Sequence, residues 1–233
     1  MKVTNSNFFS SALAKPTSLM WLGLGAVLAI LFIELALRVL AGDTMAFDRN
    51  IILAMRNPAD LSDPLGPYWF EELMRDITAL GGTGILSFIT LFTVMYLYLQ
   101  KHRHMAFLVA VMIVSGMICS SLLKYGFSRP RPDLVPHGSY VYTSSFPSGH
   151  SMMSALVYIT LAAIYARSQF RRSLKLLIMA SALLVVASIG LSRVYLGVHW
   201  PSDVLAGWCA GSIWALMSYR LVRYGQKRGK LTF

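Results

Sequence analysis

The chain has 233 residues, of which 56% are hydrophobic and 13% are charged, so it carries about half the charged residues of a typical soluble domain. Apolar runs of the length of a bilayer span recur along it, which predicts a multi-span membrane protein with one membrane-embedded domain over residues 1–233. The formal net charge of +11 does not indicate a nucleic-acid-binding protein, because the basic residues lie in short loops between apolar runs and not on one face of a soluble fold.

Six apolar segments predict six transmembrane helices packed in one all-α bundle. Each is close to the length of about 20 residues that crosses the hydrocarbon of a bilayer, and a helix satisfies all of its backbone amides internally. The first segment is too long for the core of a cleavable signal peptide, so we expect it to be retained. The predicted spans are residues 19–40, 84–100, 105–123, 151–166, 174–191 and 204–221.

The first outer loop is predicted to hold an interfacial amphipathic helix over residues 67–80. Aromatic and aliphatic residues are interleaved there with charged ones, which is typical of a helix that lies on the membrane surface. Two interpretations stay open: the helix forms a wall of a lipid entry, or it only packs against the bundle. Gly81, Gly82 and Gly84 follow it and predict a flexible turn with close helix contact.

Loop charge predicts the orientation of the chain. The N-terminal segment, the second and fourth loops and the C-terminal tail hold basic residues and no acidic residue, whereas the opposite loops hold nearly all the acidic residues. The positive-inside bias therefore places both termini in the cytoplasm and the first, third and fifth loops outside. We expect a multi-pass protein of a bacterial cytoplasmic (inner) membrane, with the outer loops on the periplasmic face.

Three polar clusters lie at the outward ends of the predicted spans. The third loop begins with residues 124–133 and ends with residues 144–150, and the fifth loop holds residues 192–203. Because the orientation was inferred from other loops, the meeting of all three clusters on one face is separate evidence for a site.

The cations of these clusters suit a phosphoryl group. Lys124, Arg131 and Arg193 supply positive charge, and the fork of an arginine matches the oxygens of a phosphate. Ser148 and Gly149 stand just before a predicted helix, where backbone N–H groups and the helix dipole favour an anion. These five residues are the candidate phosphate ligands.

The same clusters contain a candidate nucleophile and a proton donor. His199 and Asp203 are four residues apart at a helix start, so the carboxylate can fix the tautomer of the imidazole and leave its other nitrogen free to attack. His150 comes from a different loop and can protonate the leaving oxygen. Arginine and lysine can replace Mg²⁺ in such a reaction, and the loops lack the clustered carboxylates of a Mg²⁺ or Ca²⁺ site, so we expect no metal and no other cofactor.

Each of these residues also has a structural explanation when it is taken alone. Loop arginines near a membrane bind lipid headgroups, a single histidine near a helix start is a capping or interfacial residue, and Asp203 is a helix cap. Their combination on one face favours a catalytic site. Arg129 and Asp133 lie outside the pattern, and we expect them as neighbours that touch a headgroup.

The three clusters resemble the signature motifs of the type 2 phosphatidic acid phosphatase family, which is similar in its core to vanadium haloperoxidases and glucose-6-phosphatase. The motifs fall within residues 124–203. They are K-x-x-x-x-x-x-R-P at Lys124 to Pro132, P-S-G-H at Pro147 to His150, and S-R-x-x-x-x-x-H-x-x-x-D at Ser192 to Asp203.

This resemblance implies a metal-independent lipid phosphatase. His199 would form a phosphohistidine, Asp203 would orient it, and His150 would be the general acid. The residues that would hold the phosphoryl oxygens are Lys124, Arg131, Ser148, Gly149 and Arg193.

The resemblance also implies a membrane lipid phosphate or diphosphate as substrate. Undecaprenyl diphosphate is the first choice, and phosphatidylglycerol phosphate, phosphatidic acid and lipid A are further candidates. Two rival functions are a lipid-to-lipid phosphotransferase and a non-catalytic lipid-phosphate binder or transporter. The binder has no need for the pair of His199 and Asp203 together with a second histidine.

Overall fold

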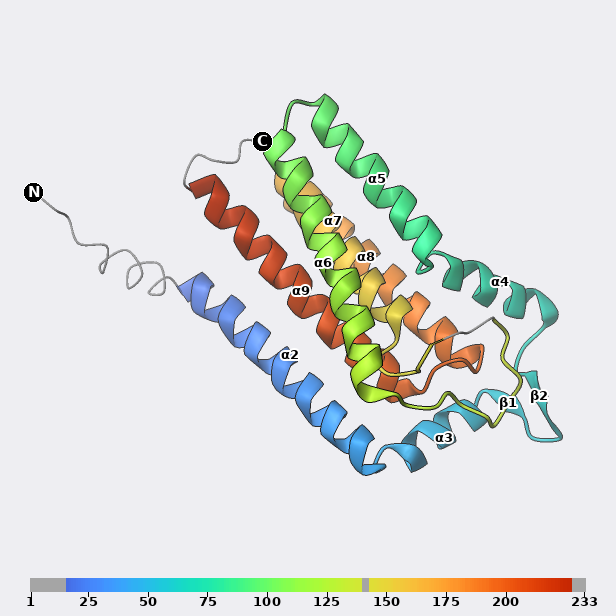
Figure 1. Ribbon diagram of the computed structural model, residues 1–233. Coiled ribbons are helices and arrows are strands. Elements are labelled where there is room, and N and C mark those ends of the chain that lie inside the picture. Colours follow the sequence, from blue (N-terminus) through green and yellow to red (C-terminus); the bar gives the residue numbers. More distant parts are fainter. Residues whose placement is uncertain (1–15, 140–142, 228–233) are drawn as a thin grey trace, which may run out of the picture.

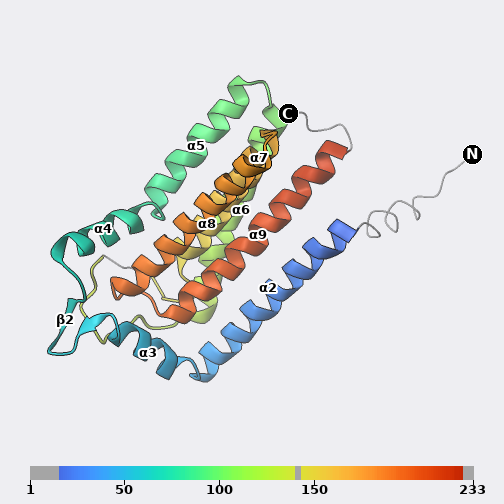
Figure 2. The same cartoon turned by 180° about the vertical axis from the view of Figure 1, so that it is seen from behind.

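The computed structural model describes residues 16–139 and 143–227 and is a bundle of long helices with short elements gathered at one end (Figure 1). Helix α2 lies at one edge of the bundle beside α9, and α5 lies at the opposite edge beside α6 (Figures 1 and 2). In chain order the elements are α2 (Pro16–Ala41), α3 (Met45–Leu53), β1 (Arg56–Asn57), β2 (Asp60–Pro64), α4 (Tyr68–Ala79), α5 (Thr83–Leu99), α6 (Arg103–Phe127), α7 (Gly149–Ser168), α8 (Arg172–Tyr195) and α9 (Pro201–Lys227).

All six predicted spans fall on helices, but only some of these helices are candidate membrane spans. In the described part of the chain, α2, α6, α7 and α8 are long and apolar enough to cross a bilayer. Helices α4 and α5 count as a fifth candidate only when they are taken as one pair, which is bent by 46°. Helix α9 is long, but glycine, serine and basic residues interrupt its apolar residues. The fold is therefore a mostly helical membrane protein with four or five candidate spans.

The apolar core lies between α5, α6, α7 and α9. Leu86, Val109, Val157 and Val222 are among its fully or almost fully buried side chains, one from each helix. Many large apolar side chains on the outer faces of the helices are exposed, for example Ile30 of α2 at 65%. In a bilayer these faces meet lipid, so their exposure agrees with a membrane protein.

Two glycines of α9 allow this helix to lie close to the start of α7. A Cβ atom on Gly207 would lie 2.7 Å from the carbonyl oxygen of Ser148, and one on Gly211 would lie 2.2 Å from that of Met152. Both distances are shorter than real Cβ contacts allow, so only glycine permits this approach. The backbone N–H of Ser148 then donates to the carbonyl oxygen of Asp203 over 3.0 Å. This contact places two of the predicted polar clusters next to each other.

The predicted helix over residues 67–80 is present as α4. Its Met74 is buried against Tyr195 and Leu196 at the end of α8, whereas Trp69 on the other face is 65% exposed. The inner face of α4 therefore packs on the loop that follows α8. A short antiparallel hairpin of β1 and β2, in which Asn57 faces Asp60, precedes this helix.

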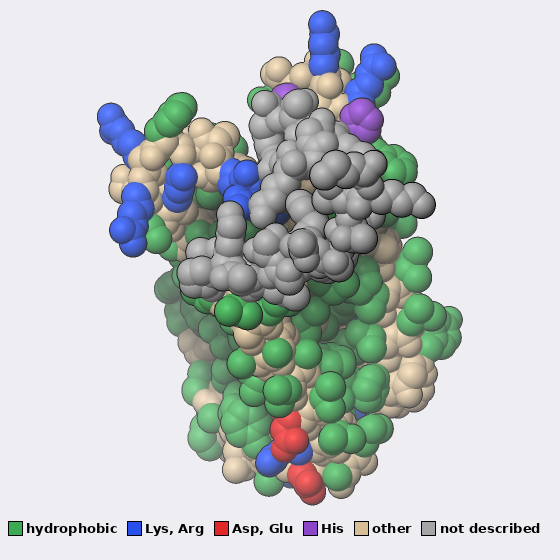
Figure 3. Space-filling view, turned by 90° about the vertical axis from the view of Figure 1, so that its left-hand side faces the viewer, with side chains coloured by type: hydrophobic (Ala, Val, Ile, Leu, Met, Phe, Trp, Pro, Cys, Tyr) green, Lys and Arg blue, Asp and Glu red, His purple; other side chains and the backbone are tan. Residues whose placement is uncertain are grey.

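The two ends of the bundle differ in charge. Figure 3 shows lysine and arginine side chains gathered at one end and acidic side chains at the other. Glu34 and Arg38, near the C-terminal end of α2, form an ion pair with 2.7 Å between Oε1 and Nε. The basic loops and the acidic loops that the sequence distinguishes thus lie at different ends of the bundle.

The glycine contact predicts a loss of stability on a minimal substitution. Gly211→Ala would push a methyl group into the backbone of α7, and overpacking of this kind costs about 1–3 kcal/mol. We expect a lower midpoint of thermal unfolding in detergent, with lower activity because the two helix starts move apart. Gly25→Ala is the matched control, since a Cβ atom there meets nothing within 4 Å. An equal midpoint for both variants would contradict the close packing of α7 and α9.

Candidate active site

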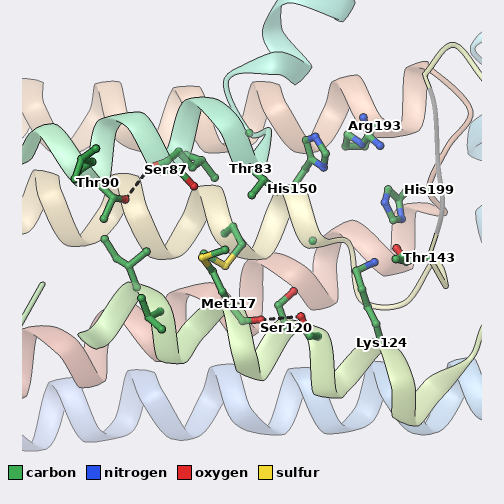
Figure 4. Close-up of a pocket in the computed structure, with 18 of the residues that line it drawn as sticks. Thr83, Ser87, Thr90, Met117, Ser120, Lys124, Thr143, His150, Arg193 and His199 are labelled. Carbon is green, nitrogen blue, oxygen red and sulfur yellow. Dashed lines mark hydrogen bonds between the residues drawn. The ribbon is translucent and has the colours of Figure 1, made fainter. Parts of the chain in front are cut away.

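Six of the eight predicted site residues line one cavity of about 590 Å³. The side chains of Lys124, His150, Arg193 and His199 converge at one end of it (Figure 4). These side chains come from α6, α7, α8 and the loop before α9, and Arg131 joins them from the loop after α6. Asp203 and Ser148 do not line the cavity and lie behind its wall.

His199 is held in one orientation by the groups on its two sides. Its side chain is almost fully buried, and Nδ1 lies 3.4 Å from Oδ2 of Asp203. On the other side Nε2 lies 3.2 Å from Nη1 of Arg131. A guanidinium can only donate, so Nε2 accepts and the proton of the neutral ring sits on Nδ1, facing the carboxylate. The lone pair of Nε2 therefore points toward the cations of the cavity.

The same surroundings keep the imidazole uncharged. Burial lowers the pKa of His199 well below its usual range, and the positive charges of Arg193, Arg131 and Lys124 lower it further. The ring is neutral at any pH above this lowered pKa, including pH 7. A neutral imidazole whose Nε2 carries no proton has the form required of a nucleophile, and a bound phosphate would take the place of Arg131 at that nitrogen.

Three cations surround the cavity end without a carboxylate among them. Lys124 Nζ donates to the carbonyl oxygen of Ser144 over 2.9 Å, and Arg131 Nη1 donates to that of Val198 over 2.7 Å. Arg193 Nη1 donates to Thr78 Oγ1 over 3.0 Å, but its Nε is buried without a partner in the described part of the chain. No aspartate or glutamate is among the described residues that line the cavity. Such a group of like charges favours an anion as ligand.

The start of α7 contributes Gly149 to the cavity wall. A Cβ atom on Gly149 would lie 3.2 Å from Cε of Lys124, so glycine leaves room for the lysine to reach the cavity. Ser148 has a different position. Its fully buried hydroxyl accepts from the backbone N–H and the hydroxyl of Ser151, as an N-cap residue does. This geometry gives no support to a phosphate contact of the Ser148 side chain.

The glycines after α4 lie against His150. A Cβ atom on Gly81 would lie 3.3 Å from Cδ2 of His150 and 2.5 Å from Cγ2 of Ile189, and one on Gly82 would lie 3.9 Å from Nε2 of His150. The expected close helix contact is therefore present, and the histidine is one of its partners. Gly84, the third glycine of the predicted turn, makes no such contact, since a Cβ atom there would meet nothing within 4 Å.

Arg129 and Asp48 are the residues that sequence reasoning did not place in the site. Arg129 was expected to touch a headgroup, but it is 8% exposed, and its Nη1 donates to Oδ1 of Asp203 over 2.6 Å. Its Nη2 donates to Oδ2 of Asp48, a fully buried residue of α3, over 2.8 Å. Asp133 is exposed. The motif assigns Arg131 to the phosphate, and Arg131 does line the cavity. It gives no role to Arg129, because the partners of Arg129 come from distant parts of the chain.

Within residues 16–139 and 143–227, no group of three or more histidine, cysteine, aspartate or glutamate residues could hold a metal ion. The polar end of the cavity offers cations and imidazoles to a ligand. Its chemistry is that of anion binding next to a nucleophilic nitrogen.

The cation cluster predicts that inorganic phosphate binds and stabilises the protein. At ten times its Kd, phosphate should raise the free energy of unfolding by about 1.4 kcal/mol, which a thermal-shift assay in detergent detects. Arg193→Gln should remove most of this response, because it takes away a charge and the unpartnered Nε. Arg223→Gln is the control, since Arg223 is exposed on α9 and does not line the cavity. A full phosphate response in Arg193→Gln would show that the anion binds elsewhere.

Comparison with known proteins agrees with the family that the motifs suggest. Residues 105–227 match the family model of the PAP2 superfamily. Phosphatidylglycerophosphatase B of Bacillus subtilis (strain 168) is 32% identical over 146 residues, which cover 61% of this chain and 70% of the relative. An undecaprenyl-diphosphatase of Sulfolobus acidocaldarius is 28% identical over 57% of this chain and 63% of its own length.

A solved structure is similar to nearly the whole chain. It is that of a transmembrane PAP2-type phosphatidylglycerolphosphate phosphatase from Bacillus subtilis, with a TM-score of 0.75 and 26% identity. The similarity covers 86% of this chain and 96% of that one. It therefore extends beyond the matched family region.

Proposed function

This chain belongs to the PAP2 superfamily, and we propose that, as a lipid phosphatase of this family, it hydrolyses a membrane lipid phosphate or diphosphate through a phosphohistidine on His199. The observation that carries the proposal is the position of Nε2 of His199, which faces three cations on one side while Asp203 holds the ring from the other. We assign the whole chain, residues 1–233, to one membrane-embedded domain.

The first step forms a bond between Nε2 of His199 and phosphorus and breaks the bond between phosphorus and the leaving oxygen. Asp203 stabilises the positive charge that develops on the imidazole through its contact with Nδ1. His150 gives a proton to the leaving oxygen, so that a lipid alcohol departs from a monophosphate, or a lipid monophosphate from a diphosphate. The negative charge of the bound phosphate offsets the nearby cations and favours the protonated form of His150.

The second step restores the enzyme. His150, now neutral, takes a proton from a water molecule whose oxygen attacks phosphorus, and the bond to Nε2 breaks to release inorganic phosphate. Lys124, Arg131 and Arg193 hold the phosphoryl oxygens in both steps, with Gly149 at the start of α7. Positioning and electrostatics supply most of the catalysis in phosphoryl transfer, and these cations provide them without a metal ion.

The shape of the cavity supports a lipid as the substrate. Away from the cations it continues between α5 and α6, where Leu91, Val94, Ile113, Val114 and Met117 line it. A ligand that fits has a phosphate at one end and a long apolar chain at the other. Hydroxyl groups of Ser87 and Ser120 lie along the way and can contact the polar linkage between the two (Figure 4).

The headgroup distinguishes the candidate substrates. We propose undecaprenyl diphosphate as the first candidate, with phosphatidylglycerol phosphate as its direct competitor, because relatives named for each are similar to this chain. Phosphatidic acid and lipid A also combine a phosphate with apolar chains, and they are the two further candidate substrates.

We propose that six helices span the membrane, namely α2 and α5 to α9, with both termini in the cytoplasm and the cavity mouth on the outer face. Helix α9 packs between α7 and α2, so protein surrounds much of it and a less apolar sequence is tolerated. Helix α4, with exposed Tyr68 and Trp69, would lie in the outer interface of a bacterial inner membrane. The basic end of the bundle would then face the cytoplasm.

The nucleophile gives the first test of the mechanism. His199→Ala should lower phosphate release from a lipid phosphate by on the order of 10⁴-fold or more, since loss of a nucleophile removes the covalent route. His104→Ala is the control, because His104 is exposed and does not line the cavity. Brief incubation of the wild type with ³²P-labelled substrate followed by alkaline quenching should trap an acid-labile label that His199→Ala lacks. Unchanged turnover in His199→Ala would remove the mechanism.

A substrate panel separates the proposed function from its rivals. Purified protein should release phosphate from the four candidate lipids, with the highest kcat/KM for the physiological headgroup. The rates should not change when a metal chelator is added, because lysine and arginine side chains stabilise the phosphoryl group in place of a metal ion. A labelled donor distinguishes hydrolysis, which yields free phosphate, from transfer, which yields a second labelled lipid. Tight binding without turnover of any lipid would favour the non-catalytic binder.

A further inference from the structure

Arg129 holds one oxygen of the Asp203 carboxylate. Nη1 of Arg129 donates to Oδ1 over 2.6 Å, while the backbone N–H of Trp200 donates to Oδ2 over 2.9 Å. Oδ2 also lies 3.4 Å from Nδ1 of His199. Both oxygens are thus occupied from fixed directions, and the carboxylate cannot rotate away from the imidazole without losing a buried hydrogen bond.

Asp48 holds Arg129 from the opposite side. Its Oδ2 accepts from Nη2 of Arg129 over 2.8 Å and from the hydroxyl of Ser202 over 2.6 Å, and its Oδ1 accepts from the backbone N–H of Ser202 over 2.8 Å. Thr44 accepts a further bond from Nη2 over 3.0 Å. The first outer loop is therefore bonded both to the arginine and to the first turn of α9, which carries Asp203.

The charges of this group explain why an arginine is needed. Asp48 and Asp203 are both fully buried, and each would be an unpaired charge without a cation between them. One guanidinium has two terminal nitrogens and can bond both carboxylates at once, which a lysine ammonium cannot do in the same plane. The indole ring of Trp200 lies 5.5 Å from the guanidinium carbon and covers it.

Arg129 has no access to the reacting phosphate. It does not line the cavity, whereas Arg131 two residues later does. On the basis of the proposed function, we infer that Arg129, clamped by Asp48, is a positioning residue that fixes the Asp203 carboxylate against Nδ1 of His199 and so keeps Nε2 of His199 aimed at phosphorus. A competing explanation is that the pair of Asp48 and Arg129 only ties the first outer loop to the bundle.

A double-mutant cycle distinguishes these two explanations. Arg129→Gln in the wild-type background should lower kcat by about 10- to 100-fold, the usual effect of losing a group that orients a reacting residue. KM should change by less than about 3-fold, because the phosphate-binding cations stay in place. In an Asp203→Asn background the same substitution should lower kcat by no more than about 3-fold, since the group through which it acts is already impaired.

Arg56→Gln is the matched control in both backgrounds. Arg56 is also a buried arginine of the outer loops, 3% exposed, and its Nη2 donates to the carbonyl oxygen of Tyr195 over 2.7 Å. No hydrogen bond or ion pair described for it involves Asp203. Its substitution should therefore change kcat by the same factor in the wild type and in Asp203→Asn.

Asp48→Asn provides a second variant for the case in which Arg129→Gln does not fold. It keeps the size of the side chain and leaves Arg129 and Asp203 in place. Like Arg129→Gln, it should lower kcat by about 10- to 100-fold in the wild-type background and by no more than about 3-fold in the Asp203→Asn background. Equal losses in both backgrounds, for whichever of the two variants folds, would overturn the inference and leave a purely structural pair. Absence of turnover in the wild type itself would instead count against the proposed function.

Discussion

The buried carboxylate of Asp203 is the group on which the arrangement of the polar end depends. A fully buried carboxylate is costly unless its oxygens are bonded and its charge is paired, and here the partners come from separate parts of the chain. Arg129 arrives from the loop after α6, Trp200 from the loop before α9, and Asp48 binds the same arginine from α3. The backbone of Asp203 also receives the N–H of Ser148 at the start of α7. Satisfying one carboxylate thus brings together four segments at the polar end of the bundle.

The cavity has the opposite electrostatic character. Lys124, Arg131 and Arg193 face it without a lining carboxylate, so the negative charge of Asp203 lies behind His199 and the positive charge lies in front of it. The negative charge behind the ring and the positive charge in front of it both shift electron density toward Nε2, the atom that would attack phosphorus. Because the cavity continues between α5 and α6 over apolar side chains, the ligand that completes its charge balance also carries an apolar chain.

Much of the fold and of the site could be predicted from the sequence, because the signals involved are local. Every predicted span falls on a helix, and the helix expected over residues 67–80 is α4, since long apolar runs and amphipathic periodicity depend on neighbours along the chain. The spacing of His199 and Asp203 brings them into contact for the same reason. The turn between α4 and α5 was expected from Gly81 and Gly82. The short length of α5, 17 residues, and the weaker apolarity of α9 were not anticipated, and neither helix qualifies as a span by itself.

What the sequence determined by itself is the membrane class, the helical elements, the family motifs and the set of charged residues at one end of the bundle. What only the tertiary structure decided is the role of two residues: Arg129 supports Asp203 from outside the cavity, and the Ser148 hydroxyl caps α7 and does not face the cavity. Those outcomes depend on contacts between residues far apart in the chain, such as Asp48 with Ser202 and Gly81 with His150. A local pattern records which side chains are present, but the direction in which a buried side chain points is set by the partners that satisfy it.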